Sequence, residues 1–331
     1  MVLSSGKSGQ ALRLRIIEQI VDIDPAAWNA LGAASYPFLR HEFLSALETE
    51  DCLGERFGWL PHHLTLWDPD ARLIGAAPLY LKFNSYGEFV FDWAWADAYQ
   101  RNGLRYYPKL VSAIPFTPAT GPRLCHLPEL DTATAWDMAI SALEQFAREQ
   151  EISSWHLLFP TQDISDQLLR RGIAQRRTVQ FHWFNDGYTC FDDFLDTFNS
   201  RKRKTLKRER RRIQEQGLDL QTRVGQQISS EDCARFYLFY QFTYAKRSGH
   251  GGYLTRAFFT DVAAAMGEQV VMVMASHGGE AIAAALYFRG GDTLYGRYWG
   301  CTQDFDALHF VACYYRGIEY CLAEGLARVD P

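Results

Sequence analysis

The chain has 331 residues, of which 47% are hydrophobic and 22% are charged, and its net charge is −5. This balance predicts an ordered globular protein with two domains or one large one, and it excludes a disordered chain. The seven cysteines form no CxxC pair and show no metal-ligand spacing, so we expect free thiols in a reducing compartment and no metal site.

The N-terminus has no apolar stretch typical of a signal peptide, and no apolar run approaches the ~20 residues that a membrane span needs. We therefore expect a cytoplasmic protein without a membrane span. The sequence does not predict an oligomeric state.

Residues 1–10 have the composition of a flexible tail, and the patterns that follow predict a first domain over residues 11–187. Its expected order is a strand, two short helices, a three-strand meander, a Pro-rich loop and a long helix, followed by a strand, a helix and a strand. The meander strands are expected at 62–67, 72–82 and 88–95, the long helix at 132–150, and the last three elements at 152–159, 164–171 and 178–184.

A second domain is expected over residues 188–331. It opens with helices at 191–198 and 200–216 and a strand at 218–224, and helices follow at 231–246 and 255–266. Gly-Gly turns separate three predicted strands at 270–276, 281–289 and 293–300, and a helix follows at 307–324. Only the beginning of a further strand follows, so we expect this domain to be incomplete at its C-terminus.

The two halves share this order of elements, and short stretches also match. Ile74-Gly-Ala-Ala77 corresponds to Ile282-Ala-Ala-Ala285, and Phe89 and Trp93 correspond to Tyr295 and Trp299. We interpret this as a tandem duplication. The expected fold class is α/β (α+β), with two domains that each hold a mixed, mostly antiparallel sheet flanked by helices.

The segment 201–212 contains nine basic residues and one acid, which gives a local charge of +8 in an acidic chain. Leu206 and Ile213 supply a thin apolar stripe at helical spacing. One interpretation is a solvated helix face without a ligand. The other is an anion site for a nucleotide-linked substrate or RNA, and its predicted binding residues are Lys202, Lys204, Arg208 and Arg211.

The order strand, two helices, three-strand meander, helix, strand resembles that of GNAT acyltransferases. Two such units with a basic helix opening the second resemble the Fem-type peptidyltransferases. Three stretches are similar to a bacterial family of Fem-like predicted N-acyltransferases: Tyr106-Tyr-Pro-Lys-Leu110 with Pro115-Phe-Thr-Pro118 and Gly121-Pro-Arg-Leu124, Ser200-Arg-Lys-Arg-Lys204, and Tyr298-Trp-Gly300.

The resemblance implies transfer of an acyl or aminoacyl group to an amine, possible acceptors being cell-wall precursors. Its possible co-substrates are acyl-CoA and aminoacyl-tRNA, and no tightly bound cofactor is implied. GNAT enzymes hold the CoA diphosphate on a glycine-containing loop at a helix N-terminus. In the first half, the partial match to that loop consists of Gln100, Arg101, Gly103 and Arg105.

The strand 293–300 is predicted to place Tyr295, Arg297 and Trp299 on one face, where they would line the transfer site. Asp304 follows it and is the candidate that would orient or deprotonate an amine. Further candidates are Asp97 beside Trp93, as part of an aromatic cleft wall, and His250 in a glycine-rich loop, as a base on a lid. Ordinary core packing, helix capping and solvation remain open for each of these residues.

We therefore predict two tandem GNAT-like domains that form a Fem-like N-acyltransferase. One alternative is a nucleic-acid-binding or polyanion-binding protein that uses the basic helix, although the chain as a whole is acidic. The other is a binding protein that keeps the fold without catalysis.

Overall fold

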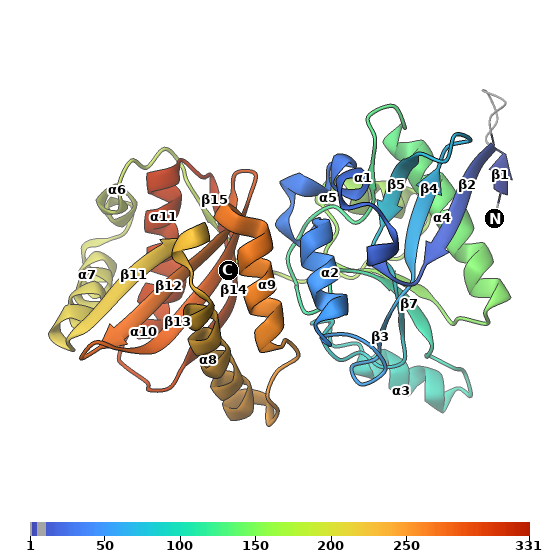
Figure 1. Cartoon of the computed structure of the whole chain (residues 1–331). Coiled ribbons are helices and arrows are strands. Elements are labelled where there is room, and N and C mark those ends of the chain that lie inside the picture. The colour runs from blue at the N-terminus through green and yellow to red at the C-terminus, as the bar shows by residue number, and fades with distance from the viewer. Residues whose placement is uncertain (1, 5–10) are drawn as a thin grey trace. The chain divides into compact units, whose positions relative to one another are not determined.

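The computed structural model describes residues 2–4 and 11–331. The chain forms two compact units that divide after Arg177 (Figure 1). The division lies earlier than the expected boundary at residue 187, because β10 (Trp183–Phe184) pairs with β15 (Arg328–Asp330) of the second unit. In the expected tail, β1 (Val2–Ser4) pairs with β2 (Ala11–Ile17), and the rest of the tail lies outside the described residues.

The larger sheet of the first unit has the strand order β1-β2-β4-β5-β8. Its remaining strands are β4 (His63–Trp67), β5 (Leu73–Ala77) and β8 (Cys125–His126). Leu64 and Leu66 of β4 belong to the core that includes α4 (Thr132–Glu149). His63, on the other face, contacts Trp28 of α1 (Pro25–Ala30) and Glu48 of α2 (His41–Thr49). Helices therefore cover both faces of this sheet.

A second sheet of the first unit has the order β3-β6-β7-β9. Its strands are β3 (Trp59–Pro61), β6 (Tyr80–Lys82), β7 (Lys109–Ser112) and β9 (Trp155–Leu157), and α5 (Gln162–Arg170) follows β9. The predicted strand 72–82 is thus two strands in different sheets, interrupted at Pro78, which has no N–H to donate to a ladder.

The predicted third meander strand at 88–95 is wrong. Asp92 precedes α3 (Trp93–Arg101), and Phe89 and Phe91 have positive φ angles of 60° and 51°, which no strand contains. The third strand is β7 instead. The match of Phe89 and Trp93 with Tyr295 and Trp299 therefore does not survive in the structure, because only the latter pair lies on a strand.

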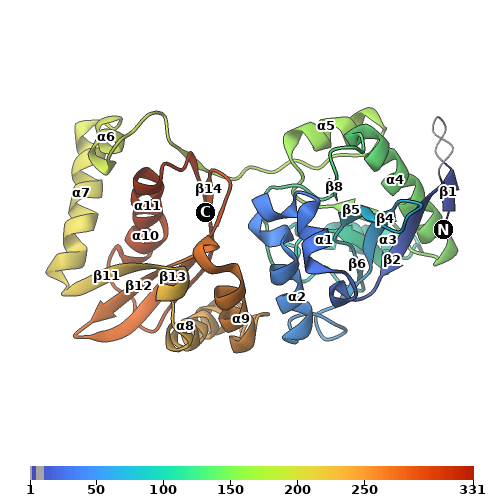
Figure 2. The same ribbon diagram turned by 45° about the horizontal axis from the view of Figure 1, so that its top comes forward.

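The second unit is built on one sheet with the order β10-β15-β14-β13-β12-β11 (Figure 2). It contains β11 (Leu218–Val224), β12 (Val270–His277), β13 (Glu280–Gly290) and β14 (Thr293–Cys301). Gly278 and Gly279, with φ angles of 58° and 85°, close the β12–β13 hairpin, as the sequence predicts. The segment expected to begin a last strand forms β15, which runs parallel to β14.

Helices cover both faces of this sheet. On one face lie α8 (Ser230–Ser248) and α9 (Arg256–Met266), and on the other lie α7 (Ser200–Glu215), α10 (Leu308–Phe310) and α11 (Arg316–Glu324) (Figures 1 and 2). A π-helical turn, Val311–Tyr315, joins the last two. The short helix α6 (Phe191–Asp196) precedes α7, whose N-cap is Asn199.

Both units place a parallel strand after a long helix: β9 beside β7 in the first, and β15 beside β14 in the second. The mixed, mostly antiparallel sheets and their flanking helices confirm the predicted fold of two GNAT-like domains. No helix in the described part of the chain combines the length and apolar character needed to cross a membrane.

Candidate functional site

Strand β14 leaves its neighbour β15 partway along its length. The two strands pair only where Thr293–Tyr295 lies beside Arg328–Asp330, and from Gly296 to Cys301 the pairing of β14 within the described residues is with β13 alone. In the part of the chain that the structure describes, β15 therefore runs beside only the first residues of β14. Such an opening in the middle of a sheet is a natural place for an extended substrate.

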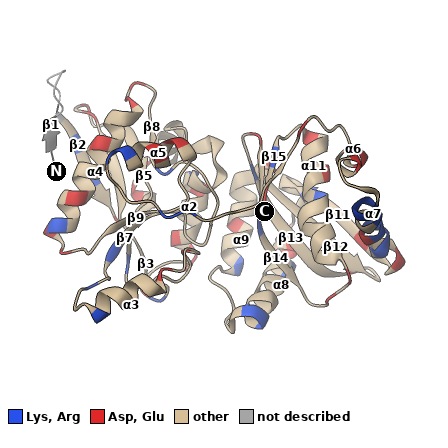
Figure 3. Cartoon of the chain, turned by 180° about the vertical axis from the view of Figure 1, so that it is seen from behind, with Lys and Arg blue, Asp and Glu red and all other residues tan. Residues whose placement is uncertain are grey.

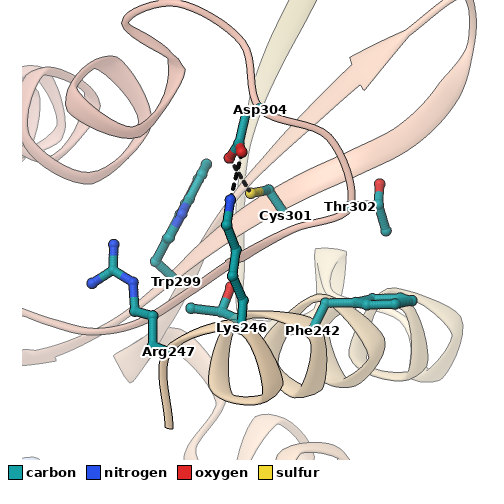
Figure 4. Close-up of a pocket in the computed structure, with 8 residues that line it drawn as sticks. Phe242, Lys246, Arg247, Trp299, Cys301, Thr302 and Asp304 are labelled. Atoms are coloured by element: carbon teal, nitrogen blue, oxygen red, sulfur yellow. Dashed lines mark hydrogen bonds and ion pairs between the residues drawn. The ribbon is translucent and has the colours of Figure 1, made fainter. Parts of the chain in front are cut away.

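A pocket of about 230 Å³ lies at the far end of β14 (Figure 4). Helix α8 supplies one wall, and the end of β14 and the loop after it supply the other. The lining residues are Phe242, Thr243, Lys246, Arg247, Trp299, Cys301, Thr302 and Asp304. The pocket thus combines aromatic surface with cations, a carboxylate and a thiol.

The charges in this pocket are partly paired. Lys246 Nζ donates to Asp304 Oδ2 at 2.6 Å, and this hydrogen bond holds the pKa of Asp304 below its usual range. Asp304 Oδ1 also accepts from Cys301 Sγ at 3.7 Å. Arg247 is exposed beside Trp299 and forms no ion pair with a described residue. The pocket therefore offers an uncompensated cation and a carboxylate that already binds one ammonium group.

The thiol in the pocket is held in its protonated form. Burial, followed by the neighbouring Asp304 carboxylate, raises the pKa of Cys301 above its ordinary value of 9.0. The nucleophilic form of cysteine is the thiolate. Cys301 is therefore poorly suited to covalent catalysis at neutral pH.

Gly300 sets the distance between the two walls. A Cβ on this residue would lie 2.1 Å from the carbonyl carbon of Phe239 and 2.5 Å from the backbone nitrogen of Tyr240. Only glycine lets the backbone of α8 approach β14 this closely. The sequence Tyr298-Trp-Gly300 thus has a structural reason: its glycine brings Lys246 and Arg247 next to the end of the strand.

The basic segment folds as the predicted helix, α7, where Lys and Arg are concentrated (Figure 3). Its cations fall into two groups. Four of them form ion pairs: Arg203 with Asp196, Lys207 with Asp192, Arg210 with Glu319, and Arg212 with Glu215 and Asp306. Apart from the pair with Glu215, which lies within α7, these ion pairs join the helix to other parts of the second unit.

The other cations of α7 form no ion pair within the described part of the chain. Arg201, Lys204, Arg208 and Arg211 recur at intervals of three or four residues and so share one exposed face, which we call the cationic stripe. This face lies opposite the buried Leu206 and Ile213. Lys202 is exposed but lies about 100° around the helix from Arg201, outside the stripe.

The C-terminal end of α7 contacts the loop that lines the pocket. Arg212 Nε lies 3.5 Å from Asp306 Oδ2, and Gln216 Nε2 donates to the Asp306 carbonyl at 3.0 Å. The Asp306 N–H donates in return to Gln216 Oε1 at 3.1 Å. Asp306 is two residues from Asp304, so the C-terminal end of α7 and the pocket meet in one short loop.

The predicted face of β14 is divided by a β-bulge. The register with β13 shifts between Leu286 and Tyr287, which leaves Arg297 without an opposite residue. Trp299 consequently packs on the α10 side, against His309, whereas Tyr298 packs on the α8 and α9 side. Tyr295 pairs across the sheet with Phe288, so it does not share a face with Trp299.

Tyr295 and Arg297 lie near the point where β14 and β15 separate. Burial raises the pKa of Tyr295, and Arg328 and Asp330 of β15 are among the charges that act on it. Arg297 is placed over the ring of Tyr298 at 5.4 Å. Neither residue lines the pocket. His250 lies on the exposed loop after α8, where its ring packs between Tyr244 and Tyr253.

The predicted phosphate loop in the first unit has the wrong position on its helix. Gln100 and Arg101 end α3, and Gly103 and Arg105 follow it. A helix C-terminus presents carbonyl groups and the negative end of the dipole, which disfavour a diphosphate. Asp97 forms an exposed ion pair with Arg101, and Arg105 forms one with Glu151. Trp93, which is partly exposed, packs against the ring of Tyr86.

Sequence reasoning missed a buried ionic cluster in the first unit. Lys109 Nζ donates to Asp92 Oδ2 at 2.6 Å, to Glu88 Oε2 at 2.8 Å and to Ser85 Oγ at 3.0 Å. Burial by itself would raise the pKa of Asp92, but hydrogen bonds from Lys109, Ser85 and Tyr106 outweigh it and lower the pKa to about 2. The signal in the sequence was a lysine within the apolar stretch Tyr106–Leu110.

Among the described residues, no group of three or more His, Cys, Asp or Glu side chains is placed to hold a metal ion.

No curated protein matches this sequence. Solved structures do share the fold. FemX is 12% identical with a TM-score of 0.53, and the alignment covers 93% of this chain and 87% of FemX.

L-PGS from Bacillus licheniformis is 10% identical with a TM-score of 0.54, covering 93% of this chain and 75% of that one. A conserved protein of unknown function from Bacteroides thetaiotaomicron is 8% identical with a TM-score of 0.53, covering 96% and 89%. Residues 19–331 match the sequence model of the FemAB_like family, which is described as peptidoglycan biosynthesis/recognition. Because this match spans nearly the whole sequence, the chain belongs to the FemAB_like family.

Proposed function

We propose that the protein is an N-acyltransferase that moves an aminoacyl group from a tRNA to an amine of a peptidoglycan precursor. The observation that carries this proposal is the cationic stripe on α7, a helix whose C-terminal end contacts the loop that lines the pocket. Membership of a family of peptidoglycan biosynthesis or recognition supports the class of acceptor.

The dimensions of the stripe favour RNA over CoA as the donor. From Arg201 to Arg211 the helix rises by about 15 Å, which is longer than a diphosphate and suited to successive phosphates of a nucleic acid backbone. The segment 301–306 contains no glycine and carries Asp304 and Asp306, so it lacks the features of a diphosphate loop. A long polyanion on the stripe would place its end beside the pocket.

The pocket supports the chemistry of direct transfer. We assign Asp304 to the acceptor amine, because its carboxylate already binds the ammonium group of Lys246. An acyl carbonyl held beside the end of β14 would need hydrogen-bond donors as negative charge develops on its oxygen. The neutral amine nitrogen then bonds to the carbonyl carbon and the ester C–O bond to the ribose breaks. The proton that the nitrogen loses passes to the departing ribose oxygen.

The test is transfer of a radiolabelled aminoacyl group to a peptidoglycan-precursor peptide, with aminoacyl-tRNA and acyl-CoA offered as separate donors. We expect labelled product from the tRNA alone. Transfer from acyl-CoA alone would refute the proposed donor. Binding of the precursor without transfer from either donor would instead identify a recognition protein and refute the proposed reaction.

The same assay distinguishes the roles of the two reactive groups in the pocket. Asp304→Asn removes the charge that attracts the amine, and we expect kcat/KM to fall by about tenfold or more. Cys301→Ser keeps the size of the side chain and removes the thiol, and we expect nearly unchanged turnover because the thiol is protonated. A large loss in Cys301→Ser would instead indicate a covalent intermediate.

A further inference from the structure

The connection between β6 and β7 is far longer than its counterpart in the second unit. Gly291 and Asp292 alone join β13 to β14, whereas residues 83–108 join β6 to β7. Both strand pairs are antiparallel neighbours that a two-residue turn could connect. The inserted residues include α3, and segments inserted between the strands of a domain often carry function.

The first half of this connection is folded with its polar groups inside and its aromatic groups outside. Ser85, Glu88 and Asp92 are buried. The exposed large side chains between and beside them are Phe83 (51%), Tyr86 (57%), Phe89 (38%), Phe91 (76%), Trp93 (44%) and Trp95 (52%). We call residues 83–95 the aromatic segment. This pattern is the reverse of an ordinary protein surface, where large apolar groups are exposed singly.

Two lysines at the base of the connection hold the aromatic segment in this orientation. Lys82 and Lys109 are register partners on β6 and β7, and both are buried. Lys109 forms ion pairs with Glu88 and Asp92, and Lys82 donates to the carbonyl of Tyr86 at 3.0 Å. Both carboxylates of the segment are thus turned inward, and its outer surface carries no charge.

The backbone at two of the exposed aromatic residues is strained. Phe89 and Phe91 occupy the left-handed region, which bulky side chains rarely adopt and which costs on the order of 1 kcal/mol or more. A soluble surface has no need for phenylalanine at such positions, where glycine or asparagine would be less strained. Phe116 also has a positive φ, but its side chain is buried, whereas Phe89 and Phe91 combine this backbone conformation with exposed rings.

We propose that the aromatic segment docks the protein on the surface of a lipid bilayer. Phenylalanine, tyrosine and tryptophan side chains are suited to the membrane–water interface, where flat rings enter the headgroup region. A protein partner would require a rim of polar groups for hydrogen bonds, and the outer surface of this segment offers few. Arg176 Nη2 donates to the Val90 carbonyl at 3.2 Å, so one cation that suits anionic headgroups lies beside the segment.

The depth of insertion is limited by the backbone. Residues 83–92 form no regular secondary structure, so their backbone lacks the helical or sheet hydrogen bonding that a segment inside the hydrocarbon core needs. The segment therefore lies among the headgroups and does not enter the hydrocarbon core. Such attachment is peripheral and reversible.

The experiment is vesicle flotation of the full chain, with vesicles of phosphatidylcholine alone and of phosphatidylcholine with phosphatidylglycerol. We expect binding to both, and tighter binding to the anionic vesicles. The variant Phe91→Asn/Trp95→Gln removes two exposed rings, and we expect its partition coefficient to fall by about tenfold or more. Asparagine tolerates the left-handed region, so the variant should remain folded.

Phe181→Gln is the matched control, because Phe181 is exposed but lies outside the segment. It should bind vesicles as the wild type does. Failure of the wild type to bind either vesicle, or equal loss in the control, would overturn the proposal. A wild-type dimer in light scattering that the double variant abolishes, without any lipid binding, would assign the segment to a second copy instead. No donor or acceptor is added, so the result is independent of the proposed reaction.

Discussion

Two lysines of the first unit have buried ammonium groups, and the groups that surround these two ammonium groups differ. Lys109 is surrounded by two carboxylates and a hydroxyl, whereas Lys82 lies 3.8 Å above the ring of Trp59 and donates to one carbonyl. Burial removes the Lys82 ammonium from water and, together with the nearby Lys109, outweighs the attraction of Glu88 and Asp92. The pKa of Lys82 falls from 10.5 to about 7 as a result.

This shift predicts a dependence of stability on pH. Between about pH 7 and pH 10.5 the unfolded chain binds a proton at Lys82 that the folded protein does not. The free energy of unfolding should therefore rise with pH across this window, since stability rises wherever the unfolded state binds more protons. In Lys82→Met this contribution disappears, and the pH dependence should become flatter.

Urea unfolding of both proteins at pH 7 and pH 9.5 measures the difference. Other groups titrate in the same window in both proteins, so only the change between wild type and variant is informative. Equal slopes of unfolding free energy against pH would show that Lys82 remains charged in the folded protein.

At the scale of the element, β14 decides the geometry of the proposed site. Gly300 and Gly296 lie on the same strand and differ in their surroundings. A Cβ at Gly300 would overlap the backbone of α8, whereas a Cβ at Gly296 would meet its nearest neighbours at 3.5 Å, an ordinary contact.

Gly300→Ala should consequently push α8 away from the strand and destabilise the protein by about 1–3 kcal/mol or more. Because α8 carries Lys246 and Arg247, acyl transfer should also fall. Gly296→Ala is the matched control and should change the free energy of unfolding only slightly. Chemical unfolding of the two variants checks this, and an unperturbed Gly300→Ala would mean that α8 packs less closely than described.

The elements show which features a sequence can reveal. The hairpins of the second unit and the helices α4 and α7 were predicted closely, because Gly-Gly turns and helical periodicity are local signals. The strand predicted at 88–95 was wrong. Its aromatic residues suggest a buried strand, but Glu88 and Asp92 are the residues that point into the protein, because they form ion pairs with the distant Lys109. No local pattern records such a contact.

The candidate site was predictable to a similar extent. Asp304 and Trp299 were found because they follow a recognisable strand, but Lys246 and Arg247 reach the pocket from a helix that is far away in sequence. Two basic residues in the last turn of a helix ordinarily complement its dipole and indicate no site. The β-bulge that separates Tyr295 from Trp299 likewise depends on the pairing with β13.

At the scale of the whole molecule, positive charge is concentrated on α7 in a chain whose net charge is −5. Ion pairs neutralise one side of the helix, and the cationic stripe faces solvent without acidic partners among the described residues. Like charges at intervals of three or four residues destabilise a helix by a few tenths of a kcal/mol per pair. A stripe that costs stability in this way is consistent with selection for binding.

The most direct test of this account is the salt dependence of tRNA binding by two matched variants. Lys204→Gln/Arg208→Gln/Arg211→Gln removes three cations of the stripe, and Arg203→Gln/Lys207→Gln/Arg210→Gln removes three that already form ion pairs. We predict that the stripe variant binds more weakly and that the slope of log affinity against log salt falls by about 2. The paired variant should keep most of the wild-type slope, and equal slopes in the wild type and the stripe variant would contradict the central claim.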